Sequence, residues 1–372
     1  MSEAIPQILE SCPSCGQTMD VTELEPFSEV GCPECGAAMR VRVHFNHFTL
    51  LEVLGEGGMG SVFKALDNTL QREVALKILK REAGADAADW AKLAAEARLT
   101  AAVNHPNVVK VFSFGEDHGR FYLAMELVEK GSLDSLMLLQ TRISEAQVLD
   151  VGIQIAEGLQ AAAEHGLIHR DIKPGNILFA TPKLAKIVDF GLARVLDEGA
   201  QESGEIWGTP FYVAPEKLDG RPEDIRSDIY SLGGTLFHAL AGRPPFDAKT
   251  ASMVVLKHIK SQVVSLQAFA PNISDETAYV INRMLHKEPS ERYQSYEELL
   301  MHLRYARQQF RKRQSGPRAK KRGKFSPEQV FLPALWTAAA VLSLAAAVWF
   351  FGLRTQFVGA PSEGRATVLD TR

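Results

Sequence analysis

The stretch that decides the fold of this chain is His169-Arg170-Asp171-Ile172-Lys173-Pro174-Gly175-Asn176. It holds a carboxylate, an ammonium group and a side-chain amide within a few residues. A carboxylate can orient a hydroxyl and accept its proton, a lysine can neutralise a phosphate, and an amide oxygen is a hard ligand for Mg²⁺. These are the groups that phosphoryl transfer needs. The string therefore predicts Asp171 as the base, Lys173 at the γ-phosphate and Asn176 at the metal.

A second short string, Asp189-Phe190-Gly191, lies further along the chain. Asp189 offers another oxygen to Mg²⁺, and Gly191 gives the backbone freedom to rearrange. Either string alone could occur by chance. Their order and spacing favour one shared site.

A glycine-rich loop lies upstream, between two strand-like segments. Glycines let the backbone come close enough for N–H groups to meet phosphates, although an ordinary hairpin turn would use the same residues. The predicted phosphate-binding residues of this loop are Leu54, Gly55, Glu56, Gly57, Gly58, Met59, Gly60, Ser61 and Val62.

Lys77 stands in the apolar run Val74–Ile78, where a charge is costly without a partner. Apolar residues recur at helical spacing over about 86–103, and Glu96 lies on this predicted helix. We expect Glu96 to hold Lys77 on the α- and β-phosphates. The alternatives are an edge-strand lysine that reaches water and a glutamate on a solvated helix face.

Residues from about 48 to 303 resemble a eukaryotic-type protein kinase domain of the Ser/Thr class, and several features are similar to bacterial members. The resemblance implies an α+β, two-lobed fold with a β-rich N-lobe and a helical C-lobe. It rests on the glycine-rich loop, Ala75-Leu76-Lys77, Glu96, the His169–Asn176 loop, Asp189-Phe190-Gly191, Ala214-Pro215-Glu216, Asp228-Ile229-Tyr230-Ser231-Leu232-Gly233 and Arg292.

This resemblance also implies the cofactors and the substrates. ATP, with Mg²⁺ or Mn²⁺, would lie between the lobes, with adenine against a hinge after Met125, and proteins would be the phosphate acceptors. The ATP-binding residues would then include Ala75, Lys77, Glu96, Glu126 and Val128. Glu216 would pair with Arg292 to brace the C-lobe. Lys173 and Gly208-Thr209-Pro210 are similar to the Ser/Thr branch.

Residues 189–216 correspond to the activation segment of that family. The resemblance implies that a phosphate on Ser203 or Thr209 pairs with Arg170, although Thr209 is expected to contact Asp171 and Lys173 instead. Two acids, Glu202 and Glu205, can supply standing negative charge near Arg170. Activity would then depend less on autophosphorylation than is usual in that family, unless these acids only face water.

Four cysteines lie in the first 35 residues, in two C-x2-C pairs separated by sixteen residues. Such spacing predicts a tetrahedral Zn²⁺ site in a ribbon too small to fold without the metal, with a degenerate ribbon as the alternative. The predicted ligands are Cys12, Cys15, Cys32 and Cys35. Acidic residues nearby and a net charge of -4 speak against nucleic acid as a partner.

Residues 331–353 carry no charge, and a helix of this length would span a bilayer of ~30 Å. Basic residues at 311–324 precede it, so the positive-inside rule places the preceding chain in the cytoplasm. A buried core helix is the alternative. We expect a single-pass protein of the inner (cytoplasmic) membrane, with the C-terminus outside.

The expected organisation has five parts. They are a Cys₄ zinc ribbon (1–45), a kinase domain (46–306; N-lobe 46–127, C-lobe 128–306), a basic juxtamembrane linker (307–330), the transmembrane helix (331–353) and an extracytoplasmic tail (354–372). Whether the chain forms a homodimer stays open. Two other functions also stay open: a pseudokinase scaffold that binds partners without catalysis, and a small-molecule kinase. The intact Lys77, Asp171, Asn176 and Asp189 argue against the scaffold.

Overall fold

The computed structural model describes residues 9–21, 24, 28–41, 43–57, 60–79, 87–117, 120–190 and 210–315. The chain divides into two compact units, Met1–Arg311 and Lys312–Arg372. No helix among the described residues is long and apolar enough to cross a membrane. The predicted membrane helix at 331–353 lies outside them.

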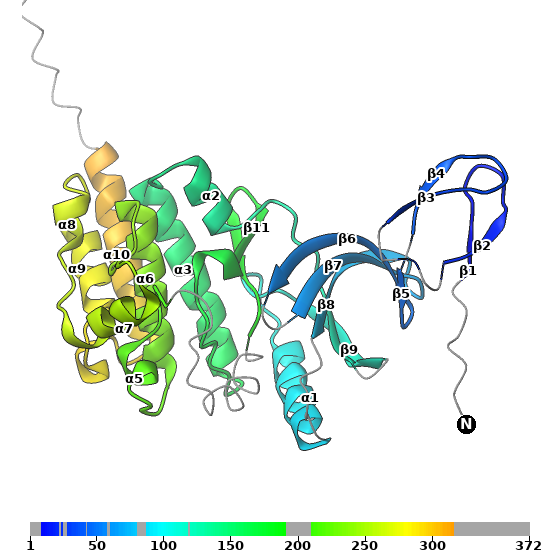
Figure 1. The fold of residues 1–372 in the computed structure, drawn as a ribbon. Helices are drawn as coiled ribbons and strands as arrows, with labels where there is room; N and C mark the ends of the chain where they lie inside the picture. The colour runs from blue at the N-terminus through cyan, green and yellow to red at the C-terminus, as the bar shows by residue number, and fades with distance from the viewer. Residues whose placement is uncertain are drawn as a thin grey trace, which may run out of the picture. The chain divides into compact units, whose positions relative to one another are not determined.

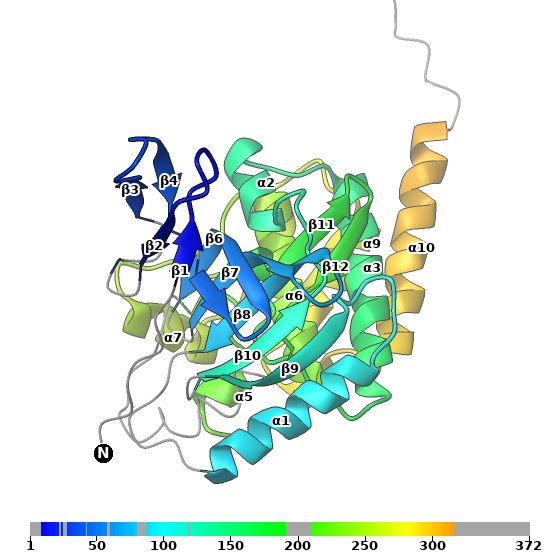
Figure 2. The same cartoon turned by 90° about the vertical axis from the view of Figure 1, so that its right-hand side faces the viewer.

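An antiparallel six-stranded sheet forms the N-terminal lobe (Figure 1). Its strand order is β5-β6-β7-β8-β10-β9, and the strands are β5 Val43–Phe45, β6 Phe48–Gly57, β7 Gly60–Asp67, β8 Arg72–Leu79, β10 Arg120–Met125 and β9 Val111–Asp117. Helix α1, Ala87–Ala102, lies beside β9 (Figure 2). The predicted helix at 86–103 is therefore confirmed.

The side chains of strand β8 pack into apolar clusters on both faces of the sheet. Successive side chains of a strand point to opposite faces. Val74, Leu76 and Ile78 join an apolar cluster with Phe48 on one face. Ala75 and Leu79 join another cluster, with α1 residues, on the other face. Lys77 belongs to this second set of alternating positions and so faces the side that α1 covers.

The cysteine-rich segment forms two short hairpins. Strand β1 (Leu9–Ser11) pairs with β2 (Thr18–Asp20), and β3 (Glu29–Gly31) pairs with β4 (Ala38–Arg40). Gly16 and Gly36 have φ of 78° and 71°, which suits glycine after each pair of cysteines. Each hairpin holds one of the two C-x2-C pairs in its turn, and the zinc ribbon itself stays a prediction.

Strand β5, which the sequence analysis counts with the ribbon, pairs with β6 at the edge of the lobe's sheet. The tight turn between them places Asn46 at φ 52°, and its backbone N–H donates to Asp117 Oδ2 at 2.6 Å. Phe45 and Phe48 both lie edge-on to the Tyr122 ring. The chain leaving the ribbon is thus fixed to the sheet.

The C-terminal lobe is mainly helical, with one small hairpin (Figure 1). Helix α6 is buried along almost its whole length and forms the centre of the core. The elements are α2 Leu133–Leu139, α3 Glu145–Ala163, η1 Pro174–Asn176, β11 Ile177–Thr181, β12 Leu184–Ile187, α5 Pro215–Leu218, α6 Ile225–Ala241, α7 Ala251–Lys260, α8 Leu266–Phe269, α9 Asp275–Met284, η2 Pro289–Glu291 and α10 Tyr296–Ser315.

A buried ion pair braces this lobe. Arg292 is fully buried, and both of its terminal nitrogens lie 2.7 Å from the Glu216 carboxylate oxygens. Ser227 Oγ donates to Glu216 Oε1 at 2.6 Å, and Arg292 also donates to backbone carbonyls of Arg226, His286 and Lys287. The pair that the family resemblance implies is confirmed. Its polar atoms are satisfied, as a buried charge requires.

Candidate active site

The catalytic-loop residues predicted from the sequence lie together between α3 and β11. Lys173 Nζ is 2.7 Å from Asp171 Oδ2. The Asn176 side-chain nitrogen donates to the same oxygen at 3.1 Å and to the Asp171 backbone carbonyl at 2.7 Å. Because the amide nitrogen is engaged there, the Asn176 carbonyl oxygen is the atom suited to a metal ion.

Helix α6 holds the start of this loop through Asp228. Backbone N–H groups of His169 and Arg170 each donate to one Asp228 carboxylate oxygen at 2.8 Å. Burial raises the pKa of Asp228, although the His169 ring and the two N–H donors act in the opposite direction. Two aligned donors need two acceptor oxygens, so the carboxylate suits this position better than an amide.

Two non-glycine residues of the site have left-handed backbones. Arg170 and Asp189 each have φ of 65°, a conformation that costs about 1–3 kcal/mol. His169 joins the two segments, since its Nε2 lies 2.8 Å from the Val188 carbonyl and its ring packs on Phe190. The surrounding contacts therefore maintain both strained residues at the centre of the site.

Lys77 and Asp189 converge from the two lobes. Lys77 Nζ lies 2.9 Å from Asp189 Oδ1, and the lysine side chain is only 8% exposed. Within the described part of the chain, the ion pair of Lys77 is with Asp189, whereas the predicted partner is Glu96. Glu96 lies on α1, which covers the same face of the sheet. The Lys77–Glu96 clamp stays a prediction.

The glycine-rich loop is the β6–β7 hairpin. Leu54, Gly55, Glu56 and Gly57 end β6, and Gly60, Ser61 and Val62 begin β7. Gly60 has φ of 151°, and an added Cβ would lie 2.2 Å from the Ile78 carbonyl oxygen. Val62 is opposite Lys77 in the β7–β8 register. The hairpin therefore begins directly beside the lysine.

The predicted hinge follows β10. Met125 ends that strand, and the Glu126 N–H donates to the Lys110 carbonyl at 2.8 Å. Glu126 Oε2 lies 2.9 Å from Lys186 Nζ. Because that carboxylate is engaged, Glu126 would meet adenine through its backbone. Val128 is half-buried beside it.

Several contacts at the site were missed from the sequence. Lys186 is a single charge in the apolar strand β12, just before Asp189, and this signal could have suggested a buried partner. Asp228 was noted only within a motif, without its contact to the loop. The predicted residues Gly58, Met59, Ser203 and Thr209 lie outside the described residues.

The four cysteines form a compact cluster. Their Sγ atoms all lie within 4.8 Å of one another, and none is in a disulfide. Backbone N–H groups of Cys15 and Ser14 lower the pKa of Cys12 to about 6, whereas, against the Gln17 N–H, burial and the neighbouring thiols raise the pKa of Cys15 to about 12. A low pKa favours the thiolate, the form that binds Zn²⁺. The donor set and its spacing fit a tetrahedral zinc ion.

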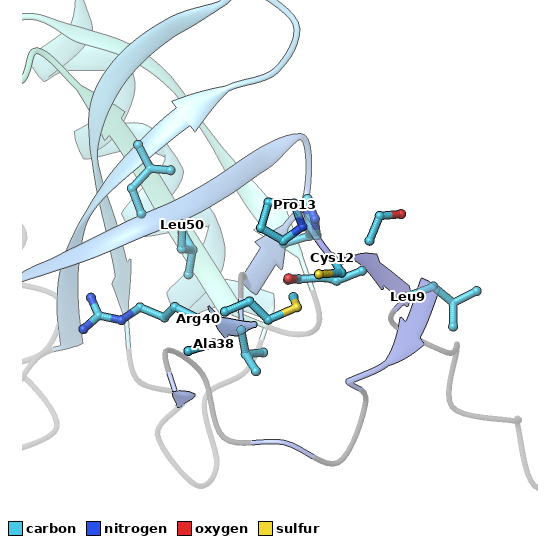
Figure 3. Close-up of a pocket in the computed structure, with 12 residues that line it drawn as sticks. Leu9, Cys12, Pro13, Ala38, Arg40 and Leu50 are labelled. Atoms are coloured by element: carbon cyan, nitrogen blue, oxygen red, sulfur yellow. The ribbon is translucent and has the colours of Figure 1, made fainter. Parts of the chain in front are cut away.

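A hollow of about 680 Å³ lies between the ribbon and the start of the sheet (Figure 3). Figure 3 shows Leu9, Cys12 and Pro13 on one side and Arg40 and Leu50 on another. Its lining also includes Glu10, which is 6% exposed. None of the lining residues is a predicted nucleotide-binding residue, so this hollow is separate from the candidate active site.

The fold and the site define a protein kinase. Residues 48–304 match the family described as "Protein kinase domain", and the chain belongs to this family. The chain is 39% identical to the serine/threonine-protein kinase PknA of Mycobacterium tuberculosis over 254 residues, which cover 67% of this chain and 58% of that protein. It therefore spans a little over half of that relative.

Two further comparisons agree. The serine/threonine-protein kinase PrkC of Bacillus subtilis is 32% identical over 253 residues, covering 68% of this chain and 39% of PrkC. The crystal structure of the PknI kinase domain from Mycobacterium tuberculosis superposes with a TM-score of 0.57 and 27% identity. It covers 71% of this chain and 97% of that one. The predicted two-lobed fold is confirmed.

Proposed function

We propose that this chain is a serine/threonine protein kinase that transfers the γ-phosphoryl group of ATP to hydroxyls of other proteins. The observation that carries the proposal is the 2.9 Å contact between Lys77 and Asp189. It brings a cation from the sheet and an acid from the other lobe to one place. The Asp171, Lys173 and Asn176 network supplies the remaining groups.

The residues at this site fit ATP and Mg²⁺. Bound ATP would supply the phosphoryl group, with Mg²⁺ or Mn²⁺ neutralising its charge. Asn176 and Asp189 offer hard oxygens to the metal, and the Lys77 ammonium can bind the α- and β-phosphates. The N–H groups of the β6–β7 hairpin can approach the phosphates because glycine keeps the backbone accessible.

Asp171 and Lys173 would act on the acceptor hydroxyl and the transferred group. Asp171 would orient the serine or threonine hydroxyl and accept its proton. Lys173, already 2.7 Å from Asp171, would counter negative charge on the γ-phosphate. Relatives named serine/threonine-protein kinases support this substrate class over a small molecule.

Transfer of radiolabelled phosphate from ATP to a generic protein tests the proposal. We expect incorporation by the wild type, on serine and threonine after acid hydrolysis, and a loss of at least about a hundredfold in Asp171→Asn. An exposed carboxylate far along the chain, Glu297→Gln, is the matched control. Transfer that survives in Asp171→Asn would remove this residue from its role. A wild type that binds ATP without transfer would support a pseudokinase scaffold.

We also propose that the ribbon binds one structural Zn²⁺ through Cys12, Cys15, Cys32 and Cys35. The cluster of reduced thiols supports this. Metal analysis of the purified full chain should give one zinc per chain, and Cys15→Ser should reduce that content. A full-length protein that contains no metal and still has a folded ribbon would contradict the proposal.

The third part of the proposal is an anchor in the inner membrane, with the kinase in the cytoplasm. The uncharged run at 331–353 and the basic residues before it support this. Cell fractionation with alkaline carbonate washing should leave the full chain in the membrane pellet. Removing residues 331–372 should release it. A full chain recovered in the carbonate wash would refute the anchor.

A further inference from the structure

The Arg170 side chain has an acidic partner that lies outside the activation segment. Arg170 Nε is 3.6 Å from Glu223 Oε2, and these side chains are only 17% and 16% exposed. Glu223 lies between α5 and α6, next to Asp224, which caps α6 by accepting from the Arg226 N–H. The pair therefore connects the start of α6 to the catalytic loop.

This contact acts on the residue that precedes the proposed base. Arg170 has a left-handed backbone, with φ of 65°. Its N–H is held by Asp228 of α6 at 2.8 Å, and its side chain is held by Glu223 from the segment just before α6. Because its backbone bonds to α6 and its side chain pairs with the segment just before α6, Arg170 restricts the direction of the neighbouring Asp171 side chain.

The surroundings of Glu223 act on its charge in opposite directions. Burial raises the pKa of Glu223, with Asp228 and Glu216 acting in the same direction, whereas Lys217 and Arg170 lower it. An unpaired arginine at this depth would be costly, and a carboxylate supplies one negative charge without modification. A phosphate would bring about −1.5 to −2 charges to the same guanidinium.

We propose that Glu223 is a positioning residue that acts through Arg170. It supplies, from the α5–α6 segment, the negative charge that holds the catalytic loop. Phosphoryl transfer therefore proceeds without a phosphate on the activation segment. This inference rests on the proposed kinase function and adds to it a residue, Glu223, that positions the catalytic loop.

A double-mutant cycle in the full chain tests the pair. Glu223→Gln removes the charge and keeps the size of the side chain. We expect kcat to fall about tenfold, while KM for ATP changes less than about twofold, because the groups that bind ATP stay in place. In an Arg170→Gln background the same change should lower kcat by less than about twofold, because the partner is already absent.

Glu288→Gln is the matched control. Glu288 pairs with Arg221 at 3.4 Å from the same neighbourhood, but both side chains are exposed and neither touches the catalytic loop. Its kcat should equal that of the wild type. A Glu223→Gln protein with wild-type kcat overturns the inference and leaves the kinase function intact. Losses that add in full in the double mutant also overturn it.

A second measurement does not depend on any variant. Wild-type protein treated with phosphatase, then freed of it, should keep at least half of its initial rate, without a lag. A near-total loss of the initial rate, recovered after incubation with ATP, would show that a phosphate holds Arg170 and would overturn the inference.

Discussion

Removing the Glu216 carboxylate should destabilise the kinase domain severely. Arg292 is fully buried, and two of its hydrogen bonds, each 2.7 Å long, end on the Glu216 carboxylate. In Glu216→Gln the guanidinium therefore keeps its backbone acceptors but loses its counter-charge. Water cannot replace the lost charge at this depth. The perturbation therefore leaves an uncompensated buried cation.

The expected magnitude follows from that burial. Breaking one partner of a buried ion pair costs about 3–5 kcal/mol. Domains are stable by only ~5–15 kcal/mol, so this is a large fraction of the total. At ~2–4 °C per kcal/mol for a domain of this size, the melting temperature should fall by roughly 6–20 °C.

Thermal unfolding followed by circular dichroism measures the change, and Glu157→Gln is the control. Arg304 Nη2 and Glu157 Oε1 are also 2.7 Å apart, but these side chains are 60% and 31% exposed. An exposed pair contributes about 0–1 kcal/mol. The two ion pairs have the same distance but different burial, so the fall in melting temperature should be severalfold larger for Glu216→Gln than for Glu157→Gln. Equal effects of the two substitutions would refute the reasoning.

Acid should reduce the same contribution. Burial alone would raise the pKa of Glu216, but hydrogen bonds and charge from Arg292 and Ser227 outweigh it, so the pKa lies below its ordinary 4.5. A depressed folded-state pKa gives stability that is full above the unfolded pKa. The difference between wild type and Glu216→Gln should shrink as pH falls below about 4.5, through the folded pKa.

Three other perturbations give separate tests. Gly60→Ala should raise KM for ATP at least about tenfold in a steady-state assay, since its Cβ would lie 2.2 Å from the Ile78 carbonyl oxygen and must displace the hairpin. Asp228→Asn should lower kcat at least about tenfold, because the amide NH₂ that replaces one carboxylate oxygen cannot accept from a loop N–H. A zinc chelator should unfold the ribbon, seen as new protease cleavage before residue 42, and leave the kinase domain resistant; an unchanged digest would contradict this.

The sequence predicts that the catalytic-loop residues lie together, because they are neighbours in the chain; their catalytic roles stay predictions. Asp171, Lys173 and Asn176 are so close in sequence that a short loop brings them into contact. Helix α1 was also predicted almost to the residue, because apolar side chains at helical spacing make a strong pattern. In both cases neighbouring residues carry most of the information.

Strand β5 and the end of β6 were harder to predict. Val43–Phe45 is too short to show an alternating pattern, and its pairing depends on the turn at Asn46. The glycine-rich loop is predicted to lie between two strands, yet β6 continues to Gly57 and β7 begins at Gly60. The β-ladder is formed by backbone groups, and these are the same in every residue, so the side-chain pattern said little about where the strand ends.

The partner of Lys77 shows a different limit. Its apolar surroundings in the strand predicted that an acid must be near. Two acids meet the requirement by position, Glu96 on α1 and Asp189 after β12, and the contact in the described residues is with Asp189. Sequence distance does not rank them, because each comes from a separate element. The three-dimensional structure brings Asp189 to Lys77, and the Lys77–Glu96 clamp stays a prediction.

Helix α6 carries none of the predicted catalytic residues, yet it supports a strained residue of the candidate site. Local preference disfavours φ of 65° at Arg170 and at Asp189, at about 1–3 kcal/mol each. Only contacts from outside the loop can offset that cost. Asp228 accepts from two loop N–H groups, and His169 connects the loop to Val188. Helix α6 thus anchors the loop that carries Asp171 and, through His169, the segment that precedes Asp189, so loosening this helix should lower kcat before it weakens ATP binding.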